Sequence, residues 1–219
     1  MQKSLLNFAE PRKKFIIEEA LAKFKELSND ANGLCLMKKL IPICNKDSVQ
    51  VQRVISVMAK HSMELAQNPY GNYAIQVALD SFDVEQCAPL LESFRGKFAQ
   101  LSMLKFSSNA IERCLEKADL KRRNDILKEL ISPEKLLGIP YNFIYRIALM
   151  KNNFGNYVVQ KALMIAEGDM KVEIGMAIQE NIPHLSDKKL KTKWIQILDK
   201  SLNLRSTTSS LGSSKNQVS

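Results

Sequence analysis

The sequence predicts an all-α protein whose helices stack as an α-solenoid, and two observations support this prediction. Apolar residues recur with helical periodicity along nearly the whole chain, as in residues 15–27, and alternating strand patterns are hard to find. A five-residue unit also recurs in three versions, Asn72-Tyr73-Ala74-Ile75-Gln76, Ser108-Asn109-Ala110-Ile111-Glu112 and Asn156-Tyr157-Val158-Val159-Gln160. The second copy follows the first by 36 residues, and the third follows after 48, which is one more unit with a 12-residue insertion. Such a period is typical of solenoids, whose units must stack to bury their apolar faces.

The first elements along the chain are a partial helical unit at 1–27 and a degenerate repeat at 28–59. Residues 15–27 have the pattern of one amphipathic helix. In the degenerate repeat a weak copy of the unit, Gly33-Leu34-Cys35-Leu36-Met37, stands 39 residues before the first full copy. Asn32-Gly33 is the expected break before its middle helix, and 48–59 is expected to be its last helix. With Gly33, Leu34 and Met37 at the first, second and fifth positions, this unit can pack but offers almost no polar group.

Three well-marked repeats follow at 60–95, 96–131 and 132–181, each expected to contain a short first helix, a middle helix with the five-residue unit, and a third helix. A turn at Asn68-Pro69 should precede the first middle helix, and Ser107 and Ser108 are expected to cap the second. The insertion, with two prolines and a glycine, should extend the first segment of the last repeat. A helical cap is expected at 182–203, with Trp194 as a packing residue, and a mobile Ser-rich tail at 204–219.

The five-residue units have the chemistry needed to read nucleic-acid bases. Their first and fifth residues are four apart and therefore share one helix face. A Gln amide matches the O4 acceptor and N3–H donor of uracil, and the Asn before it could donate to uracil O2. An ionised Glu only accepts, and so matches the N1–H and N2–H donors of guanine, with Ser as a second contact. The flat residue at the second position can stack between bases, which for aromatic rings is worth roughly 1–3 kcal/mol per base.

The sequence therefore predicts three base-reading sites, and in two of them a basic residue follows the fifth position. The predicted site residues are Asn72, Tyr73, Gln76, Ser108, Asn109, Glu112, Arg113, Asn156, Tyr157, Gln160 and Lys161. One base per helical repeat, read by two or three side chains, is an established way to recognise single-stranded RNA.

These segments resemble the Pumilio (PUF) family of RNA-binding repeats. The similarity is carried by "LAQNPYGNYAIQVAL", "LSMLKFSSNAIERCLEKA" and "NNFGNYVVQKAL", and the order NYxxQ, SNxxE, NYxxQ is similar to the last three of the family's eight repeats. The resemblance implies a right-handed α-solenoid of three-helix repeats, an armadillo-like superhelix with a C-terminal helical cap. It further implies single-stranded RNA bound antiparallel to the chain, with 5′-U, G and U facing the last, middle and first full repeats. The next base would face the degenerate repeat and be poorly discriminated.

On the same resemblance, the chain would bind messenger RNA 3′ untranslated regions as a monomer in the cytoplasm and recruit deadenylase or translational-repression factors. Two alternatives stay open. A divergent PUF protein could bind structured or ribosomal RNA without sequence preference, although the intact triplets argue against it. A helical scaffold of armadillo or HEAT type could bind an acidic or helical protein, although this gives no reason for the units to recur in phase.

Composition agrees with an anionic partner and excludes several other classes. Lys and Arg number 32 against 23 Asp and Glu, a formal net charge of +9. No signal peptide, membrane span, phosphate-binding loop or nucleophile motif is found, so neither an enzyme, a cofactor nor a membrane partner is expected. The four cysteines lack metal-ligand spacing and are expected to be small buried residues, so no metal site is predicted. The lysines of the cap, Lys188, Lys189, Lys191 and Lys193, are expected on a solvated face.

Overall fold

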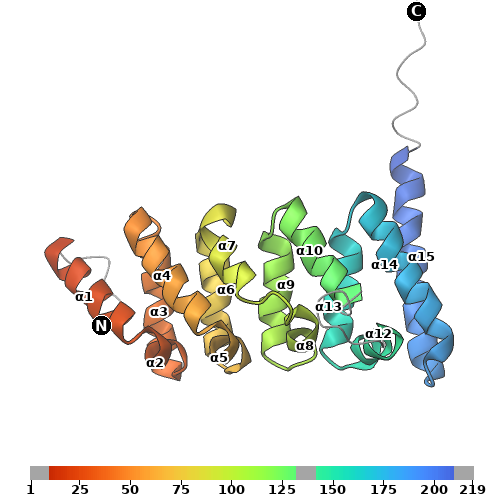
Figure 1. The fold of residues 1–219 in the computed structure, drawn as a ribbon, viewed down its shortest axis with the longest axis horizontal. Coiled ribbons are helices and arrows are strands. Elements are labelled where there is room, and N and C mark those ends of the chain that lie inside the picture. Colours follow the sequence, from red (N-terminus) through yellow and green to blue (C-terminus); the bar gives the residue numbers. More distant parts are fainter. Residues whose placement is uncertain (1–9, 132–141, 210–219) are drawn as a thin grey trace, which may run out of the picture. The chain divides into compact units, whose positions relative to one another are not determined.

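The computed structural model describes residues 10–131 and 142–209, and every regular element within these two ranges is a helix (Figure 1). The prediction of an all-α fold is therefore confirmed. The chain divides into two compact units, Met1–Ile126 and Leu127–Ser219. Unit 1 holds α1 to α9 and most of α10, and unit 2 holds the end of α10 and the helices that follow it.

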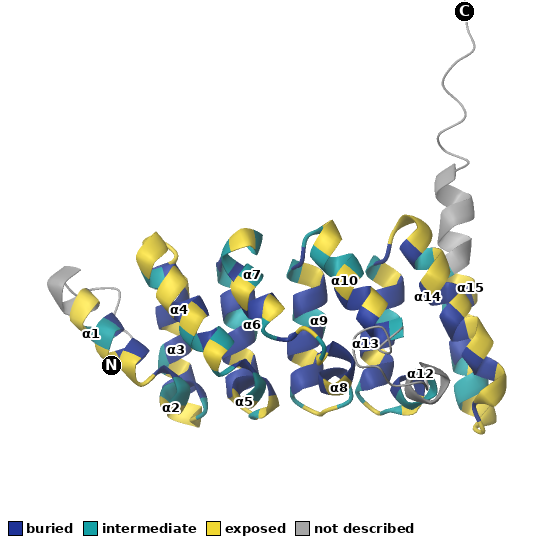
Figure 2. Cartoon of the chain, viewed as in Figure 1, coloured by how far each residue is buried: buried dark blue, intermediate teal, exposed yellow. Residues whose placement is uncertain are grey.

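Unit 1 consists of a leading helix and three successive sets of a short, a middle and a third helix. The helices are α1 (Glu10–Ala22), α2 (Phe24–Ser28), α3 (Ala31–Cys44), α4 (Ser48–Lys60), α5 (Ser62–Gln67), α6 (Gly71–Ser81), α7 (Val84–Glu92), α8 (Phe98–Ser102), α9 (Ser107–Lys117) and α10 (Leu120–Ile131). The middle helices α3, α6 and α9 pack side by side, and α4 packs against α7 (Figure 1). Figure 2 shows the buried residues on the faces that these helices turn toward one another. The core is thus built by stacking one set of helices on the next.

Two helix boundaries within residues 10–59 differ from the sequence expectation. Residues 15–27 do not form one helix, because the chain breaks at Lys23 between α1 and α2. The middle helix α3 begins at Ala31, so Asn32 and Gly33 lie in its first turn and not before it. The side chain of Asp30 caps this turn by accepting hydrogen bonds from the N–H groups of both residues, at 2.9 and 2.8 Å. The limits proposed for the repeats themselves stay predictions.

Unit 2 contains one further repeat and the C-terminal cap. Its helices are α12 (Asn142–Lys151), α13 (Gly155–Ile165), α14 (Gly168–Asn181), the 3₁₀ turn η2 (Ile182–His184) and α15 (Lys188–Ser209). The middle helix α13 packs against α12, α14 and α15. Trp194 on α15 is fully buried, and its indole N–H donates to the carbonyl oxygen of Met150 at 3.3 Å, which confirms its packing role.

Parts of two sequence predictions fall outside the described residues. Residues 132–141 contain most of the predicted insertion, and residues 210–219 contain most of the tail expected to be mobile. The backbone of α15 continues to Ser209, beyond residue 203, where the cap was expected to end.

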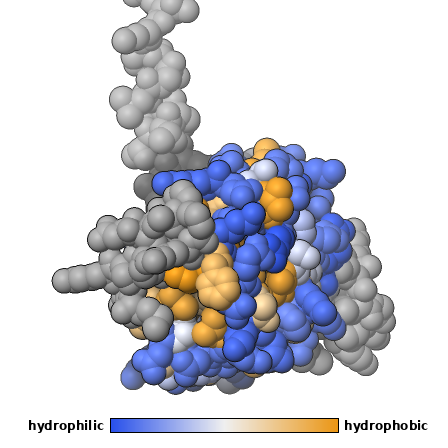
Figure 3. All heavy atoms as spheres, turned by 90° about the vertical axis from the view of Figure 1, so that its left-hand side faces the viewer, coloured by the Kyte–Doolittle hydropathy of each residue, from blue (hydrophilic) through white to orange (hydrophobic). Residues whose placement is uncertain are grey.

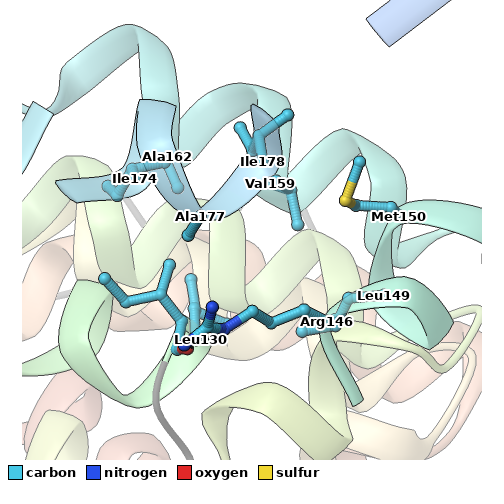
Figure 4. Close-up of a pocket in the computed structure, with 10 residues that line it drawn as sticks. Leu130, Arg146, Leu149, Met150, Val159, Ala162, Ile174, Ala177 and Ile178 are labelled. Atoms are coloured by element: carbon cyan, nitrogen blue, oxygen red, sulfur yellow. Dashed lines mark hydrogen bonds between the residues drawn. The ribbon is translucent and has the colours of Figure 1, made fainter. Parts of the chain in front are cut away.

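A small apolar cavity of about 20 Å³ lies inside unit 2, among the end of α10, α12, α13 and α14 (Figure 4). Its walls include Leu130, Met150, Val159 and Ile178. Figure 4 shows Arg146 stretched along its edge, where the guanidinium Nε donates to the carbonyl oxygen of Ile131 at 2.5 Å. A space of this size holds about one water molecule, so it is a packing gap and not a ligand site.

The end of unit 1 formed by α1 and α4 exposes apolar side chains. Phe15 is 66% exposed and Val49 is 60% exposed. A groove of about 490 Å³ between these helices is lined by Leu21, Val57 and the charged side chain of Arg53, among others. Figure 3 views this end and shows hydrophobic side chains gathered among hydrophilic ones. Surfaces of this kind in repeat proteins are normally covered by a neighbouring repeat or a polar cap.

Three of the four cysteines are buried, as expected, and one is not. Burial raises the pKa of the Cys44 and Cys87 thiols to about 11 and also raises the pKa of the Cys114 thiol. These three therefore behave as small apolar residues. Cys35 is exposed, so the expectation is wrong there.

Candidate nucleic-acid interface

A close contact between the first helix of each repeat and the middle helix that follows it recurs in all four repeats. This contact identifies which residues of the four middle helices are equivalent. In α3, α6 and α13 a glycine packs against the carbonyl oxygen of a leucine six residues earlier, and a Cβ there would lie 2.3, 2.7 and 3.0 Å from that oxygen. In α9 a serine takes this place, and its hydroxyl donates to the carbonyl of Leu101, again six residues earlier, at 2.6 Å. The equivalent positions are Gly33, Gly71, Ser107 and Gly155.

This alignment moves the degenerate repeat by one residue from its expected register. Gly33 matches Gly71 and not Asn72, so the weak copy of the unit starts one residue later. The first, second and fifth positions of α3 are Leu34, Cys35 and Lys38. Burial agrees, since Leu34 and Met37 are 6% and 0% exposed, while Cys35 and Lys38 lie on the surface. The expectation that Met37 holds the fifth position is therefore wrong, and the exposed thiol is explained because Cys35 occupies the place of Tyr73.

The first residue of the unit is buried in α6 and holds the fifth residue in place. Asn72 is fully buried, and its amide nitrogen donates to the carbonyl oxygens of Asn68 and Pro69 at 2.9 and 3.1 Å. Its Oδ1 accepts a hydrogen bond from Nε2 of Gln76 at 3.0 Å. The N–H groups expected to reach uracil O2 are thus bonded within the protein. Half-buried Gln76 keeps its second N–H and its Oε1 for a ligand.

The same motif in α13 has a different set of hydrogen bonds. Asn156 again donates to two backbone carbonyls, those of Asn152 and Asn153, at 2.8 and 3.1 Å. Nε2 of Gln160, however, has two acceptors in the protein, Oδ1 and the backbone carbonyl of Asn156, at 2.9 and 3.1 Å. Because an amide nitrogen has only two N–H groups, Gln160 offers a ligand its acceptor oxygen and no N–H donor.

In α9 the corresponding residues are Ser108 and Glu112. Ser108 is 4% exposed, and Glu112 is half-buried with its carboxylate on the same helix face. Neither Ser107 nor Ser108 caps the helix, contrary to expectation. Their hydroxyl groups donate to backbone carbonyls, those of Leu101 and Lys105, and do not accept from the free N–H groups of the first turn.

The second residue of each unit is exposed, as a stacking residue must be. Tyr73 is 45% and Tyr157 57% exposed, and Asn109 is exposed as well. Each tyrosine ring has an ammonium group over it. Lys38 Nζ of α3 lies 4.9 Å from the ring centroid of Tyr73, and Lys193 Nζ of α15 lies 5.4 Å from that of Tyr157. Both contacts are cation–π interactions within one unit.

The basic residues after the fifth position are placed beside the unit. Arg113 forms ion pairs with Asp80, at 3.3 Å, and with Glu116, at 2.7 Å. Any contact of Arg113 with a phosphate therefore competes with two carboxylates. Lys161 is half-buried at the equivalent position of α13.

Two lysines at the predicted sites were not found from the sequence. Lys193 donates to Oδ1 of Asn156 at 3.0 Å, although it was expected on a solvated face. The two residues are 37 positions apart, so only the packing of α15 on α13 brings them together. Lys38 was missed because the degenerate repeat was aligned one residue too early. The leucine six residues before Gly33, Gly71 and Gly155 was the sequence signal that could have corrected the alignment.

Neither a metal-binding cluster nor a membrane-spanning helix is found in the described parts of the chain. Residues 10–131 and 142–209 contain no group of three or more His, Cys, Asp or Glu side chains that could hold a metal ion. Within the same ranges, no helix is long and apolar enough to cross a membrane.

Comparison with known proteins gives matches that agree with this geometry. The Pumilio-family RNA binding repeat matches residues 61–93, 97–131 and 147–174, which contain α6, α9 and α13. Pumilio homolog 12 of Arabidopsis thaliana is 33% identical over 172 residues, covering 78% of this chain and 27% of that protein. The chain thus spans about a quarter of the length of this relative.

Solved structures show the same fold. A Puf4 mutant bound to the Cox17 RNA 3′ UTR recognition sequence aligns with a TM-score of 0.77 at 18% identity, over 93% of this chain and 59% of that one. The RNA-binding domain of yeast Puf5p bound to SMX2 RNA aligns with a TM-score of 0.72 at 22% identity, over 92% and 60% of the two chains. The matched repeats, the identity to this relative and the helical fold agree, and the chain therefore belongs to the Pumilio (PUF) family of repeat proteins.

Proposed function

We propose that this chain binds single-stranded RNA by reading three successive bases, 5′-UGU-3′, with α13, α9 and α6. The observation that carries the proposal is the repeated geometry of these helices. In each, a polar fifth residue shares a helix face with a buried first residue, and an exposed flat side chain stands beside it. Such an arrangement offers one hydrogen-bonding edge and one stacking surface per repeat.

The hydrogen-bond inventory of each helix suits a particular base. Gln76 keeps one N–H and Oε1, which match O4 and N3–H of uracil. The carboxylate of Glu112 is able to accept two hydrogen bonds when it is ionised, which is what N1–H and N2–H of guanine require. Gln160 presents an acceptor for N3–H of uracil. Asn72 and Asn156 contribute by fixing the glutamine amides, and Tyr73 and Tyr157 contribute stacking.

The wider role of the protein is proposed from its relatives. Structural neighbours are described as bound to RNA 3′ UTR recognition sequences, and the net charge of +9 favours an anionic partner. We propose that the chain binds messenger RNA 3′ untranslated regions in the cytoplasm, as a monomer. It would then repress or destabilise these messengers by recruiting deadenylase or translational-repression factors. These relatives are about two and a half to three times as long as this chain, and so the proposal concerns only the repeats that they share with it.

A binding selection from a random single-stranded RNA pool tests this function. We expect enrichment of UGU, followed by a base without strong preference. Enrichment of structured RNA would favour a shape-reading PUF protein, and no enrichment above background would favour a protein-binding scaffold. Either of these results would refute the proposed base code.

A further inference from the structure

The α13 site differs from the α6 site in one respect that its motif does not reveal. Both helices carry Asn-Tyr-x-x-Gln, but the glutamine of α6 has one N–H left for a ligand, and the glutamine of α13 has none. Uracil presents two carbonyl oxygens besides its N3–H, and these need a donor. The α13 site therefore requires a donor from elsewhere if it binds a base as closely as α6.

Lys193 is placed to provide that donor. Its Nζ lies 3.0 Å from Oδ1 of Asn156, the same oxygen that accepts from Gln160 at 2.9 Å. The ammonium group is therefore next to the amide of Gln160. It also lies 5.4 Å from the ring centroid of Tyr157, the stacking residue of this site. One side chain from the cap thus contacts two residues of the base-reading triplet and adjoins the third.

The ammonium group has hydrogen-bonding capacity to spare for a ligand. Lys has three N–H donors and no acceptor, and Asn156 accounts for one of them. A base stacked beside Tyr157 would meet the acceptor Oε1 of Gln160 and the donor Nζ of Lys193 together. We propose that Lys193 is the third specificity residue of the α13 site, donating to a carbonyl oxygen of the base bound there. This inference rests on the proposed function and assigns a role to a residue outside the repeat motif.

The main alternative is that Lys193 contacts a phosphate, as surface lysines commonly do in RNA-binding proteins. An abasic nucleotide separates these roles, because it keeps the phosphate and sugar and removes only the base. Binding is measured for an RNA containing UGU and for the same RNA with an abasic nucleotide at the first position. Wild-type protein, Lys193→Met and Lys189→Met are compared, since Lys189 lies exposed on the same helix and its substitution removes the same charge.

Lys193→Met should weaken binding of the UGU RNA about tenfold, which is equivalent to about 1.4 kcal/mol. The same substitution should weaken binding of the abasic RNA by less than about twofold. Lys189→Met should weaken both RNAs equally and by about twofold or less. Lys193→Gln, a neutral side chain that keeps an N–H donor, is measured beside them and should retain part of the preference for the intact base. Thermal unfolding of every variant shows whether the fold is kept, and a folded Lys193→Gln protein decides the question if Lys193→Met does not fold.

Equal losses for the UGU and abasic RNAs would overturn the base contact and assign Lys193 to the phosphate. No loss for either RNA would overturn any ligand role. The proposed function has a separate readout, the preference for G over U at the middle base, which α9 reads without Lys193. If that preference is absent, the function and this inference both fail, whereas a preserved preference with equal losses refutes the inference alone.

Discussion

Converting α9 to the Asn-Tyr-x-x-Gln motif of α6 and α13 should change the middle base of the recognised RNA from G to U. The change is the triple substitution Ser108→Asn, Asn109→Tyr and Glu112→Gln. An asparagine at position 108 would occupy the place of Asn72, where the carbonyls of residues 104 and 105 correspond to the two that Asn72 uses. The glutamine would then be fixed as Gln76 is, and would offer one donor and one acceptor in place of two acceptors.

The size of the effect follows from the contacts exchanged. A carboxylate that accepts two N–H donors of guanine forms a bidentate pair, and such pairs are worth about 1–3 kcal/mol of discrimination between bases. Wild-type protein should therefore prefer UGU over UUU by roughly 5- to 150-fold, and the triple variant should reverse the order by a similar factor. The added tyrosine should strengthen binding of both RNAs, because stacking is tolerant of sequence.

Fluorescence anisotropy with UGU and UUU oligomers measures this reversal. Glu92→Gln on α7 is the matched control, since it removes one negative charge from the same unit and leaves α9 unchanged. It should raise the affinity for both RNAs slightly and leave their ratio unaltered. If the triple variant is folded and still prefers UGU, Glu112 is not the residue that reads guanine.

Two further pairs of variants are informative. The first separates base reading from electrostatic attraction, and the second separates a steric clash from helix propensity. Gln160→Ala should reduce the binding free energy for UGU RNA by roughly 1–3 kcal/mol and relax the choice of base at the first position. Lys189→Ala should weaken the binding of all RNAs slightly and equally. Titrations against cognate and scrambled RNA measure both effects. Equal losses for both RNAs with Gln160→Ala would favour general electrostatic attraction. Gly33→Ala should lower the free energy of unfolding by about 1–3 kcal/mol, because its Cβ would lie 2.3 Å from the carbonyl oxygen of Leu27. Gly175→Ala in α14, where a Cβ meets nothing within 4 Å, should raise it by up to about 1 kcal/mol in the same denaturation assay.

The sequence was sufficient for the class of fold and for the position of the three full units. Helical periodicity and the recurrence of the unit depend on local pattern, and both are visible without tertiary contacts. In α6, α9 and α13, the face that carries the polar first and fifth residues also followed from spacing, since residues four apart lie on one side. Trp194 was correctly placed in the core because a large aromatic residue in an amphipathic helix is buried more often than exposed.

The hydrogen bonds within each site could not be predicted in the same way. Asn72 and Asn156 were assigned to the ligand because their amides are suitable, yet backbone carbonyls of the preceding turn accept both N–H groups. That outcome depends on how the turn is folded, which side-chain chemistry does not determine. The difference between Gln76 and Gln160 and the role of Lys193 arise from tertiary packing, where identical motifs meet different neighbours.

The degenerate repeat shows how a structural contact corrects a register, and it yields a direct test. Gly33 was first aligned with an asparagine, but its approach to the Leu27 carbonyl identifies it with the glycine that precedes the unit. The triple variant Leu34→Asn, Cys35→Tyr, Lys38→Gln should therefore prefer U at the base after UGU by roughly 1–3 kcal/mol. The wild-type protein should bind RNAs with any of the four bases at that position within about 1 kcal/mol of one another.

The earlier register supplies the matched control, because Met37→Gln would place an amide in a fully buried position. That variant should lose stability and gain no base preference, since a buried amide without a partner costs about 1–3 kcal/mol. Binding to four oligomers that differ only at this base measures the triple variant, and thermal unfolding verifies its fold. A folded triple variant with no preference would mean that α3 presents these positions away from the RNA, and that the first repeat serves only to cover the apolar face of α6.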